Sequence, residues 1–141
     1  MELLKLADLA LTYTSLDAID YIDGGHLYGT MEGSFTGERL SGDLRLTNLA
    51  PRRGDNVNLP TLRGLLTTRD GAAVWLELDG LATLRPSDEA RVFVTSCRFR
   101  TGDERYVWLN STFGILEGVL DSVGVGGRAR GSVFECRATL A

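Results

Sequence analysis

A chain of 141 residues is long enough for one domain with one hydrophobic core, and a hydrophobic content of 43% is typical of a globular protein. The net charge of −4 excludes the basic character that binding to DNA or RNA usually requires. The sequence holds no apolar run near the roughly 20 residues that span a bilayer, and the N-terminal segment lacks a secretory signal pattern. We therefore expect a cytoplasmic protein with no nucleic-acid partner and no membrane partner.

The first half of the chain indicates β structure. Residues 2–11 fit a short amphipathic helix, but Leu9, Leu11 and Tyr13 alternate as in a strand, and the sequence leaves both interpretations open. Glycine is abundant, with 17 residues, and proline is scarce, with 3. These glycines separate short apolar stretches, which is typical of turns and bulges between strands. Residues 31–46 predict one hairpin of this kind.

The clearest hairpin has arms at residues 62–67 and 73–78. Between them stands Asp70-Gly71, a pair favoured in tight hairpin turns because glycine tolerates a positive φ. The segment between these hairpins, residues 48–60, is the longest irregular stretch, and Pro86 is suited to open a short helical turn.

Three further strands are expected in the last third of the chain. They cover residues 90–99, 105–120 and 132–140, with a turn at residues 101–103. About seven to nine short strands in one domain predict a closed barrel or a sandwich, and closure removes exposed strand edges. We therefore predict an all-β protein in which residues 1–141 form a single small antiparallel β-barrel, lipocalin-like in general shape, with about eight to ten strands.

The sequence gives little support for a cofactor site or a metal site. Residues 124–129 match the G-x-G-x-x-A dinucleotide pattern, but that pattern needs a following helix, and the residues after Ala129 are typical of a strand. A metal site needs convergent ligands, whereas this chain has one histidine, His26, and two separated cysteines, Cys97 and Cys136. We expect no metal, no cofactor and reduced thiols.

Two groups of residues offer binding or proton transfer. If residues 105–120 form a strand, Tyr106, Trp108 and Asn110 share one face, which suits either a cavity wall or an ordinary core with Asn110 fixing a turn. Glu77 and Glu135 lie inside apolar strand patterns. A carboxylate turned into a barrel would have a raised pKa and could transfer protons, but the period of two also allows both side chains to face solvent.

The stretch from Phe99 to Asn110 resembles a known family. Phe99-Arg100-Thr101-Gly102, followed by Tyr106-Val107-Trp108-Leu109-Asn110, is similar to the F-E-T-G and Y-x-W-L-N motifs of the bacterial domain-of-unknown-function family 3237. Two upstream blocks match in the same order: residues 33–42 fit G-x-F-x-G-x-x-L-x-G, and residues 68–72 fit T-x-D-G-A. The resemblance implies a small antiparallel barrel that often forms dimers or larger assemblies, and it implies no particular reaction.

Three functional hypotheses remain open. The first is a homo-oligomeric barrel that binds a small, partly apolar organic molecule; its expected lining residues are Trp75, Glu77, Tyr106, Trp108, Asn110, Tyr28 and Arg98. The second is a cyclase, isomerase or lyase without a cofactor, with Glu77 and Tyr106 as acid–base groups. The third is a filled barrel that acts through an oligomeric interface, with Val107 and Leu109 facing outward. A buried carboxylate beside a polar cavity would favour catalysis, and an apolar cavity without a proton carrier would favour binding alone.

Overall fold

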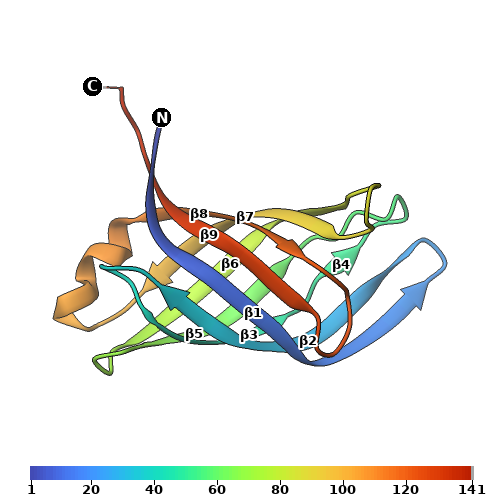
Figure 1. Cartoon of the computed structure of the whole chain (residues 1–141), viewed down its shortest axis with the longest axis horizontal. Coiled ribbons are helices and arrows are strands. Elements are labelled where there is room, and N and C mark those ends of the chain that lie inside the picture. Colours follow the sequence, from blue (N-terminus) through green and yellow to red (C-terminus); the bar gives the residue numbers. More distant parts are fainter. Residues whose placement is uncertain (141) are drawn as a thin grey trace.

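The computed structural model describes residues 1–140 and shows eight antiparallel strands that close into a barrel (Figure 1). Around the barrel the strand order is β1-β9-β8-β7-β6-β5-β3-β2, and pairing of β1 with β2 closes the ring. The predicted antiparallel barrel is thus confirmed. The strands are β1 (Glu2–Tyr21), β2 (Gly24–Thr36), β3 (Gly42–Asn48), β5 (Thr61–Thr68), β6 (Ala73–Leu84), β7 (Arg91–Arg100), β8 (Phe113–Leu120) and β9 (Arg128–Arg137); the short β4 (Pro51–Arg52) pairs with β2, and η1 (Glu104–Ser111) is a 3-10 helix.

The hairpins follow from local sequence. In the β5–β6 hairpin Thr67 lies opposite Ala73, and the turn between them places Gly71 at a φ of +89°, as expected for Asp70-Gly71. The hairpin predicted for residues 31–46 is formed by β2 and β3, with Phe35 opposite Gly42. Residues 86–88 form a turn between β6 and β7, so the short helix expected at Pro86 is not present.

The N-terminal segment is a strand, as its alternating residues indicated. Leu9, Leu11 and Tyr13 point into the barrel and are buried. This strand pairs with β2 along one edge and with β9 along the other, and its register shifts between Lys5 and Ala7 and between Tyr13 and Ser15. Such bulges bend a strand and increase its twist, which lets β1 complete the barrel wall.

The prediction of one strand over residues 105–120 is wrong in its first half. Residues Glu104–Ser111 form η1, and the strand begins only at Phe113. The side chain of Asp103 caps the helix by accepting a hydrogen bond from the backbone N–H of Arg105. A strand would have placed Val107 and Leu109 on one face, whereas the helix separates them: Leu109 is fully buried and Val107 is 57% exposed.

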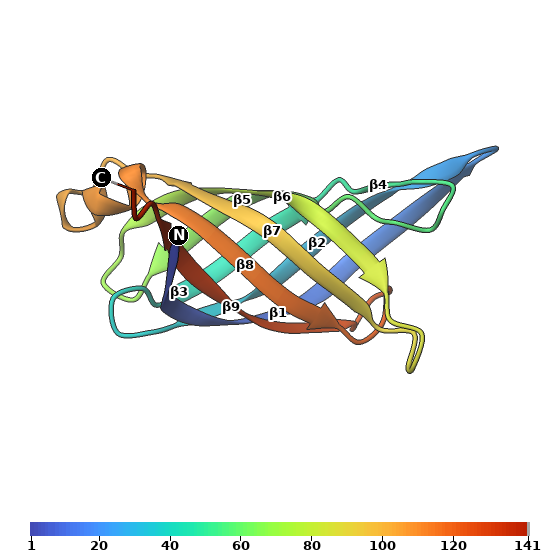
Figure 2. The ribbon, with the colours of Figure 1, turned by 90° about the horizontal axis from the view of Figure 1, so that it is seen from above.

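The barrel has two different ends (Figure 2). We call the end that holds η1, the β2–β3 turn and the β5–β6 turn the closed end, because Leu109 packs there into the hydrophobic core. Both chain ends leave from this end, and the N-terminal ammonium donates a hydrogen bond to Thr139 Oγ1 at 2.8 Å. We call the other end the open end. It carries the projecting tip of the β1–β2 hairpin, residues 49–60, the β6–β7 turn and the β8–β9 turn.

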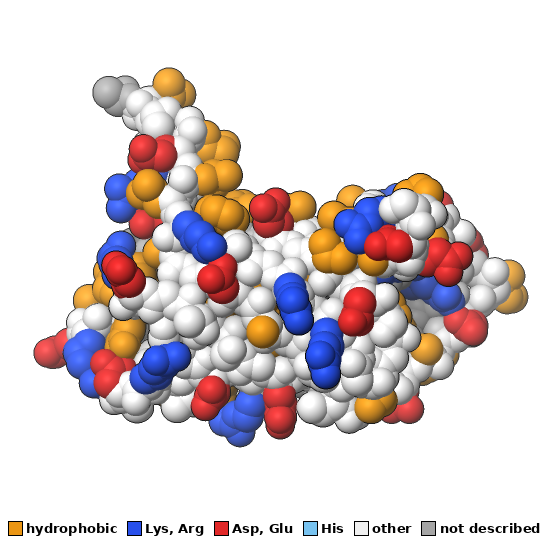
Figure 3. All heavy atoms as spheres, in the orientation of Figure 1, with side chains coloured by type: hydrophobic (Ala, Val, Ile, Leu, Met, Phe, Trp, Pro, Cys, Tyr) orange, Lys and Arg blue, Asp and Glu red, His pale blue; other side chains and the backbone are white. Residues whose placement is uncertain are grey.

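The hydrophobic core fills the barrel towards the closed end. Its fully buried side chains include Phe35, Leu44, Leu66, Leu76 and Leu116. Small residues allow the strands to approach: a Cβ on Gly64 would stand 2.0 Å from the carbonyl oxygen of Arg45 on the neighbouring strand. Side chains of both charge signs are interspersed over the barrel face in Figure 3, while hydrophobic side chains gather along the projecting terminal segment.

Both cysteines are free thiols, as predicted, with Cys97 buried and Cys136 partly exposed. None of the helices in residues 1–140 is long and apolar enough to cross a membrane. Within the same range no group of three or more histidine, cysteine, aspartate or glutamate residues is arranged to hold a metal ion.

Candidate functional site

The open half of the barrel contains a cavity of about 60 Å³. Because one water molecule needs about 10–15 Å³ of such space, this cavity has room for a short chain of small atoms. Its wall is mainly aliphatic and comes from the inward faces of most barrel strands. The apolar lining includes Leu9, Leu11, Met31, Leu62, Leu78 and Leu116.

Strand β7 supplies two of the polar groups of the cavity through its alternation. Arg91, Phe93 and Thr95 all point inward and line the cavity, while Cys97 and Phe99 continue the same face into the core. Arg91 stands where β7 begins at the open end, and only 9% of its surface is exposed. A cation therefore lies at the mouth of an otherwise apolar cavity.

The guanidinium of Arg91 is held by neutral oxygen atoms. Its Nη1 donates to the backbone oxygen of Asn56 at 2.5 Å, and its Nη2 donates to Asn56 Oδ1 at 2.7 Å. Arg91 makes no ion pair with any residue from 1 to 140. Burial lowers the pKa of Arg91, and the nearby Arg52 cation lowers it further. Arginine nevertheless remains charged, because its intrinsic pKa is above about 12.

Two other buried polar atoms at this site have no partner. Asn58 Oδ1 and Thr95 Oγ1 make no hydrogen bond within the described chain, although the two residues are only 6% and 2% exposed. Leaving such an atom unsatisfied costs about 1–3 kcal/mol, so each case requires an explanation. Asn58 and Thr95 both line the cavity, so a bound molecule with polar atoms is a direct explanation.

A third polar group in the cavity is the pair of Tyr13 and Asn48. Asn48 Nδ2 donates to the Tyr13 hydroxyl at 2.9 Å, and Asn48 Oδ1 accepts from the backbone N–H of Thr61 at 3.2 Å. Burial raises the pKa of Tyr13, so the phenol keeps its proton at neutral pH. Because its oxygen already accepts from Asn48, the hydroxyl hydrogen can be donated to a molecule in the cavity.

A second cavity of about 180 Å³ lies at the mouth of the first. The two cavities share Leu27, Asn58, Arg91 and Val123, so they are neighbours separated by at most these side chains. His26 and Arg52 also line this outer cavity, and Arg52 forms an ion pair with Asp20. The outer cavity is therefore lined by two arginines, of which Arg52 is paired with Asp20 and Arg91 is shared with the inner cavity.

The sequence-predicted residues on strands lie on the outer wall of the barrel. Trp75 is 42% exposed and Tyr28 is 57% exposed, because Leu76 and Leu27, next to them in the chain, take the inward positions. Glu77 accepts a hydrogen bond from Arg98 at 3.1 Å and lies 3.6 Å from Arg63. Glu77 and Arg98 thus form an ion pair on the outer surface and do not line the cavity.

The predicted residues of η1 lie at the closed end. Tyr106 donates its hydroxyl hydrogen to Asp70 Oδ1 at 2.8 Å. The guanidinium of Arg39 lies 4.0 Å from the ring centroid of Trp108. Asn110 accepts from the backbone N–H of Thr101 at 2.8 Å and donates to the Thr101 carbonyl at 2.9 Å. Asn110 therefore fixes a turn, which was the alternative interpretation of its position.

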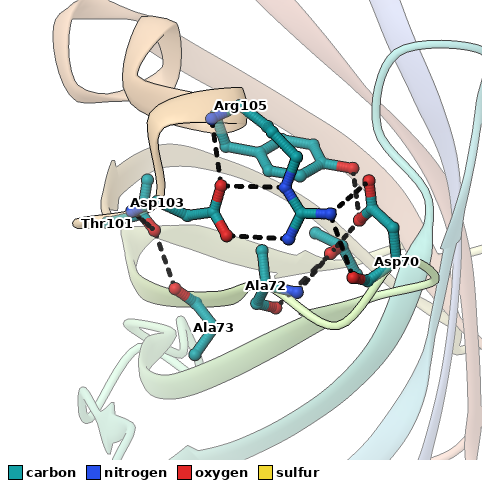
Figure 4. A network of polar contacts seen from close by, with 8 residues as sticks. Asp70, Ala72, Ala73, Thr101, Asp103 and Arg105 are labelled. Carbon is teal, nitrogen blue, oxygen red and sulfur yellow. Dashed lines mark hydrogen bonds and ion pairs between the residues drawn. The ribbon is translucent and has the colours of Figure 1, made fainter.

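A polar network joins η1 to the β5–β6 turn (Figure 4). The guanidinium of Arg105 donates to both carboxylate oxygens of Asp103 at 3.0 and 2.8 Å and to the backbone oxygen of Asp70 at 3.1 Å. These hydrogen bonds from Arg105 lower the pKa of Asp103 to about 2. Asp70 also accepts from Thr68 Oγ1 at 2.6 Å.

All three sequence blocks of the family resemblance meet at this closed end. The block at residues 33–42 carries Arg39, which covers Trp108, and the block at residues 68–72 carries Asp70, which binds Tyr106 and Arg105. The motif residues therefore attach η1 to the end of the barrel. Within residues 1–140, no member of this network lines the cavity at the open end.

The polar residues of the cavity are Tyr13, Asn48, Asn58, Arg91 and Thr95, and sequence reasoning did not select them. A signal existed for most of them, and it is clearest for Arg91 and Thr95. In residues 91–99 the polar Arg91 and Thr95 alternate in register with Phe93, Cys97 and Phe99. Two polar residues on a face that is otherwise apolar indicate groups turned into the interior. Asn48 ends β3 on the buried face of Leu44 and Leu46, so the same period applied to it. For Asn58, in an irregular segment, no such period was available.

Solved structures of other proteins share the fold of this chain. No family model and no curated protein matches the chain, so membership of family 3237 stays a prediction. A conserved protein of unknown function from Rhodopseudomonas palustris has a TM-score of 0.80 at 18% identity, over 95% of this chain and 96% of that chain. A beta-barrel like protein from Acinetobacter baumannii has a TM-score of 0.81 at 18% identity, over 96% of each chain.

A third solved structure is described as an enzyme, from Penicillium herquei. It has a TM-score of 0.69 at 19% identity, over 94% of this chain and 93% of that chain. At these identities the likeness shows the fold alone. The chain is thus a small closed β-barrel of an architecture shared by proteins from bacteria and a fungus.

Proposed function

We propose that this protein binds a small, partly apolar organic molecule in the open half of its barrel. The observation that carries the proposal is the apolar cavity with unpartnered buried polar atoms on Asn58 and Thr95. Barrels of about eight strands have space for one small ligand when their side chains do not fill the interior. Here the core is filled towards the closed end, and a second cavity adjoins the first at the open end.

The chemistry of the lining favours binding over catalysis. Among the described residues that line the inner cavity there is no aspartate and no glutamate. The titratable groups that line it are the Tyr13 phenol, whose pKa is raised by burial, and the Arg91 guanidinium, whose pKa is lowered by burial. A site with apolar walls and few proton carriers is suited to holding a molecule rather than to moving its protons.

Native mass spectrometry of the freshly purified protein, compared with its denatured mass, is the first test. We expect an additional non-covalent mass on the native protein. Isothermal titration calorimetry with hexan-1-ol, a slim neutral probe, measures cavity binding independently of the natural ligand. Absence of both the additional mass and the probe binding would contradict the proposal.

A matched pair of variants locates the binding. Ala82 is 5% exposed and lines the cavity, whereas Ala73 on the same strand is exposed on the outer wall. Ala82→Leu adds three carbon atoms to the cavity and is expected to weaken probe binding at least tenfold. Ala73→Leu makes the same chemical change outside and should leave the affinity unchanged. Equal effects of the two substitutions would place the probe elsewhere.

A second candidate function is a cyclase, isomerase or lyase without a cofactor, acting in the same cavity. It is favoured by the available hydroxyl hydrogen of Tyr13 and by the structural likeness to a protein described as an enzyme. Tyr13 would then be the proton donor in place of Glu77 and Tyr106. The molecules that co-purify with the unmodified protein and with Tyr13→Phe distinguish the two functions: different molecules indicate turnover, and identical molecules indicate binding alone.

Self-association remains part of the proposal. Leu81 and Val94 lie opposite each other on β6 and β7, Val92 is their neighbour, and all three side chains are exposed on the outer wall. An apolar group of this kind favours contact with a second copy. Light scattering after gel filtration should give the mass of a dimer or larger assembly, and the mass of a single chain would refute this part.

A further inference from the structure

The charge balance at the open end singles out Arg91. Three other arginines there each pair with a nearby carboxylate: Arg52 with Asp20, Arg53 with Asp55, and Arg85 with Asp88. Those arginines keep 35%, 51% and 42% of their side chains exposed. Arg91 is nine-tenths buried, yet its observed partners are only the two oxygens of Asn56.

A buried cation without an anion is unusual, because desolvation penalises the charge unless a partner compensates for it. The least exposed of these arginines is thus the one without a counter-charge. Its guanidinium has five N–H donors, and Asn56 satisfies only part of them. Because Arg91 lines both the inner and the outer cavity, an anion that enters from solvent would meet it first.

The surroundings of Arg91 favour a negative charge and then an apolar body. His26 and Arg52 line the outer cavity of about 180 Å³ beside Arg91. Further in, the cavity of about 60 Å³ is aliphatic except for its few polar atoms. Arg91, which has no carboxylate partner within residues 1–140, therefore lies where the outer cavity adjoins the aliphatic inner one.

From this arrangement we propose that the natural ligand is a small carboxylic acid, with its carboxylate held by Arg91 at the mouth and a slim apolar body in the inner cavity. The inference rests on the proposed binding function and names the ligand class. A planar guanidinium matches a carboxylate through two parallel hydrogen bonds. One unpaired guanidinium also balances a single negative charge, which suits a carboxylate better than a doubly charged phosphate.

The unpartnered atoms add a second requirement for tight binding. Asn58 Oδ1 is an acceptor and needs a donor, and Thr95 Oγ1 can donate or accept. A hydroxyl group on the body of the acid would supply a donor to Asn58. We therefore expect hydroxy acids to bind more tightly than unsubstituted acids of the same length.

The test compares hexanoate with hexanamide, which has nearly the same shape but no charge, by isothermal titration calorimetry at pH 7. We expect hexanoate to bind the unmodified protein at least tenfold more tightly than hexanamide. A series from butanoate to octanoate should gain about fourfold per added methylene until the inner cavity is full. Equal affinities for hexanoate and hexanamide would overturn the inference without any variant.

Arg91→Met then tests the residue, because methionine keeps an unbranched apolar stem and removes the charge. In this variant the preference for hexanoate should disappear, while binding of the neutral probe and of hexanamide remains. The matched control is Arg85→Met, at an exposed arginine that is paired with Asp88 outside the cavity. A preference that survives Arg91→Met, or that is lost equally in Arg85→Met, would overturn the assignment to Arg91.

The outcomes separate the two proposals. If the neutral probe binds but hexanoate has no advantage over hexanamide, only the carboxylate inference fails. If neither the probe nor any acid binds, the binding function fails as well. If Arg91→Met does not fold, Arg91→Lys is the second variant, because lysine keeps the charge but lacks the planar guanidinium. We expect it to retain a reduced preference for hexanoate. An undiminished preference would contradict the role of paired hydrogen bonds.

Discussion

Replacing Leu109 with alanine should release η1 from the closed end of the barrel. Leu109 is the one residue of η1 that is fully buried, and it packs into the hydrophobic core. Truncation of a buried leucine to alanine costs about 2–5 kcal/mol, depending on how far the surroundings relax. We expect about 3 kcal/mol, the lower half of that range, because a short helix at the barrel end can shift to fill part of the space.

Urea unfolding at equilibrium measures this change in the free energy of unfolding directly, and a thermal melt should show a fall in Tm of about 10 °C for a chain of this length. The control is Val107→Ala on the same helix, where the side chain is 57% exposed and the expected change is within about 0.5 kcal/mol. A cost below about 1 kcal/mol for Leu109→Ala, or equal costs for both variants, would refute the view that Leu109 anchors η1.

Other regions of the barrel give three further predictions. A Cβ at Gly64 would stand 2.0 Å from a neighbouring backbone oxygen, whereas nothing lies within 4 Å at Gly102; Gly64→Ala should therefore lower the urea midpoint strongly, and Gly102→Ala should not. A thiol reagent should label Cys136 rapidly and Cys97 only on unfolding, since burial raises the pKa of the Cys97 thiol; fast labelling of both would contradict its burial. The Asp103 carboxyl should titrate near pH 2 by NMR. The stability that its ionised form provides is therefore present above about pH 4 and is lost as the pH falls towards 2. A midpoint at the ordinary pKa of 3.8 would contradict the hydrogen bonds that lower this pKa.

The strands could be predicted where their causes are local. Alternation placed Leu9, Leu11 and Tyr13 on one face, and Asp70-Gly71 specified a turn, so the sequence alone indicated these parts of the barrel. The 3-10 helix could not be predicted in this way. Its aromatic residues have high strand propensity, and the helix depends on a cap from Asp103 and on burial of Leu109 against strands that are distant in sequence.

The site shows the same division between local and distant causes. The inward position of Arg91 follows from the period of β7, so it was accessible to sequence reasoning. The position of Asn58 was not, because it depends on pairing with Ala82, through hydrogen bonds between segments that share no sequence pattern. Aromatic motif residues such as Trp108 were predicted to line a cavity, but their contacts attach η1 to the closed end of the barrel.

The hydrogen bond between the N-terminal ammonium and Thr139 has a practical consequence. Because the two ends of the chain lie side by side and leave from the closed end, a short linker can join them into a circular backbone, and new ends can be opened at an exposed turn. In the same way, a tag at either end can fix the barrel to a sensor surface with the cavity mouth directed away from the support. Immobilised protein would then keep its route for ligand entry unobstructed.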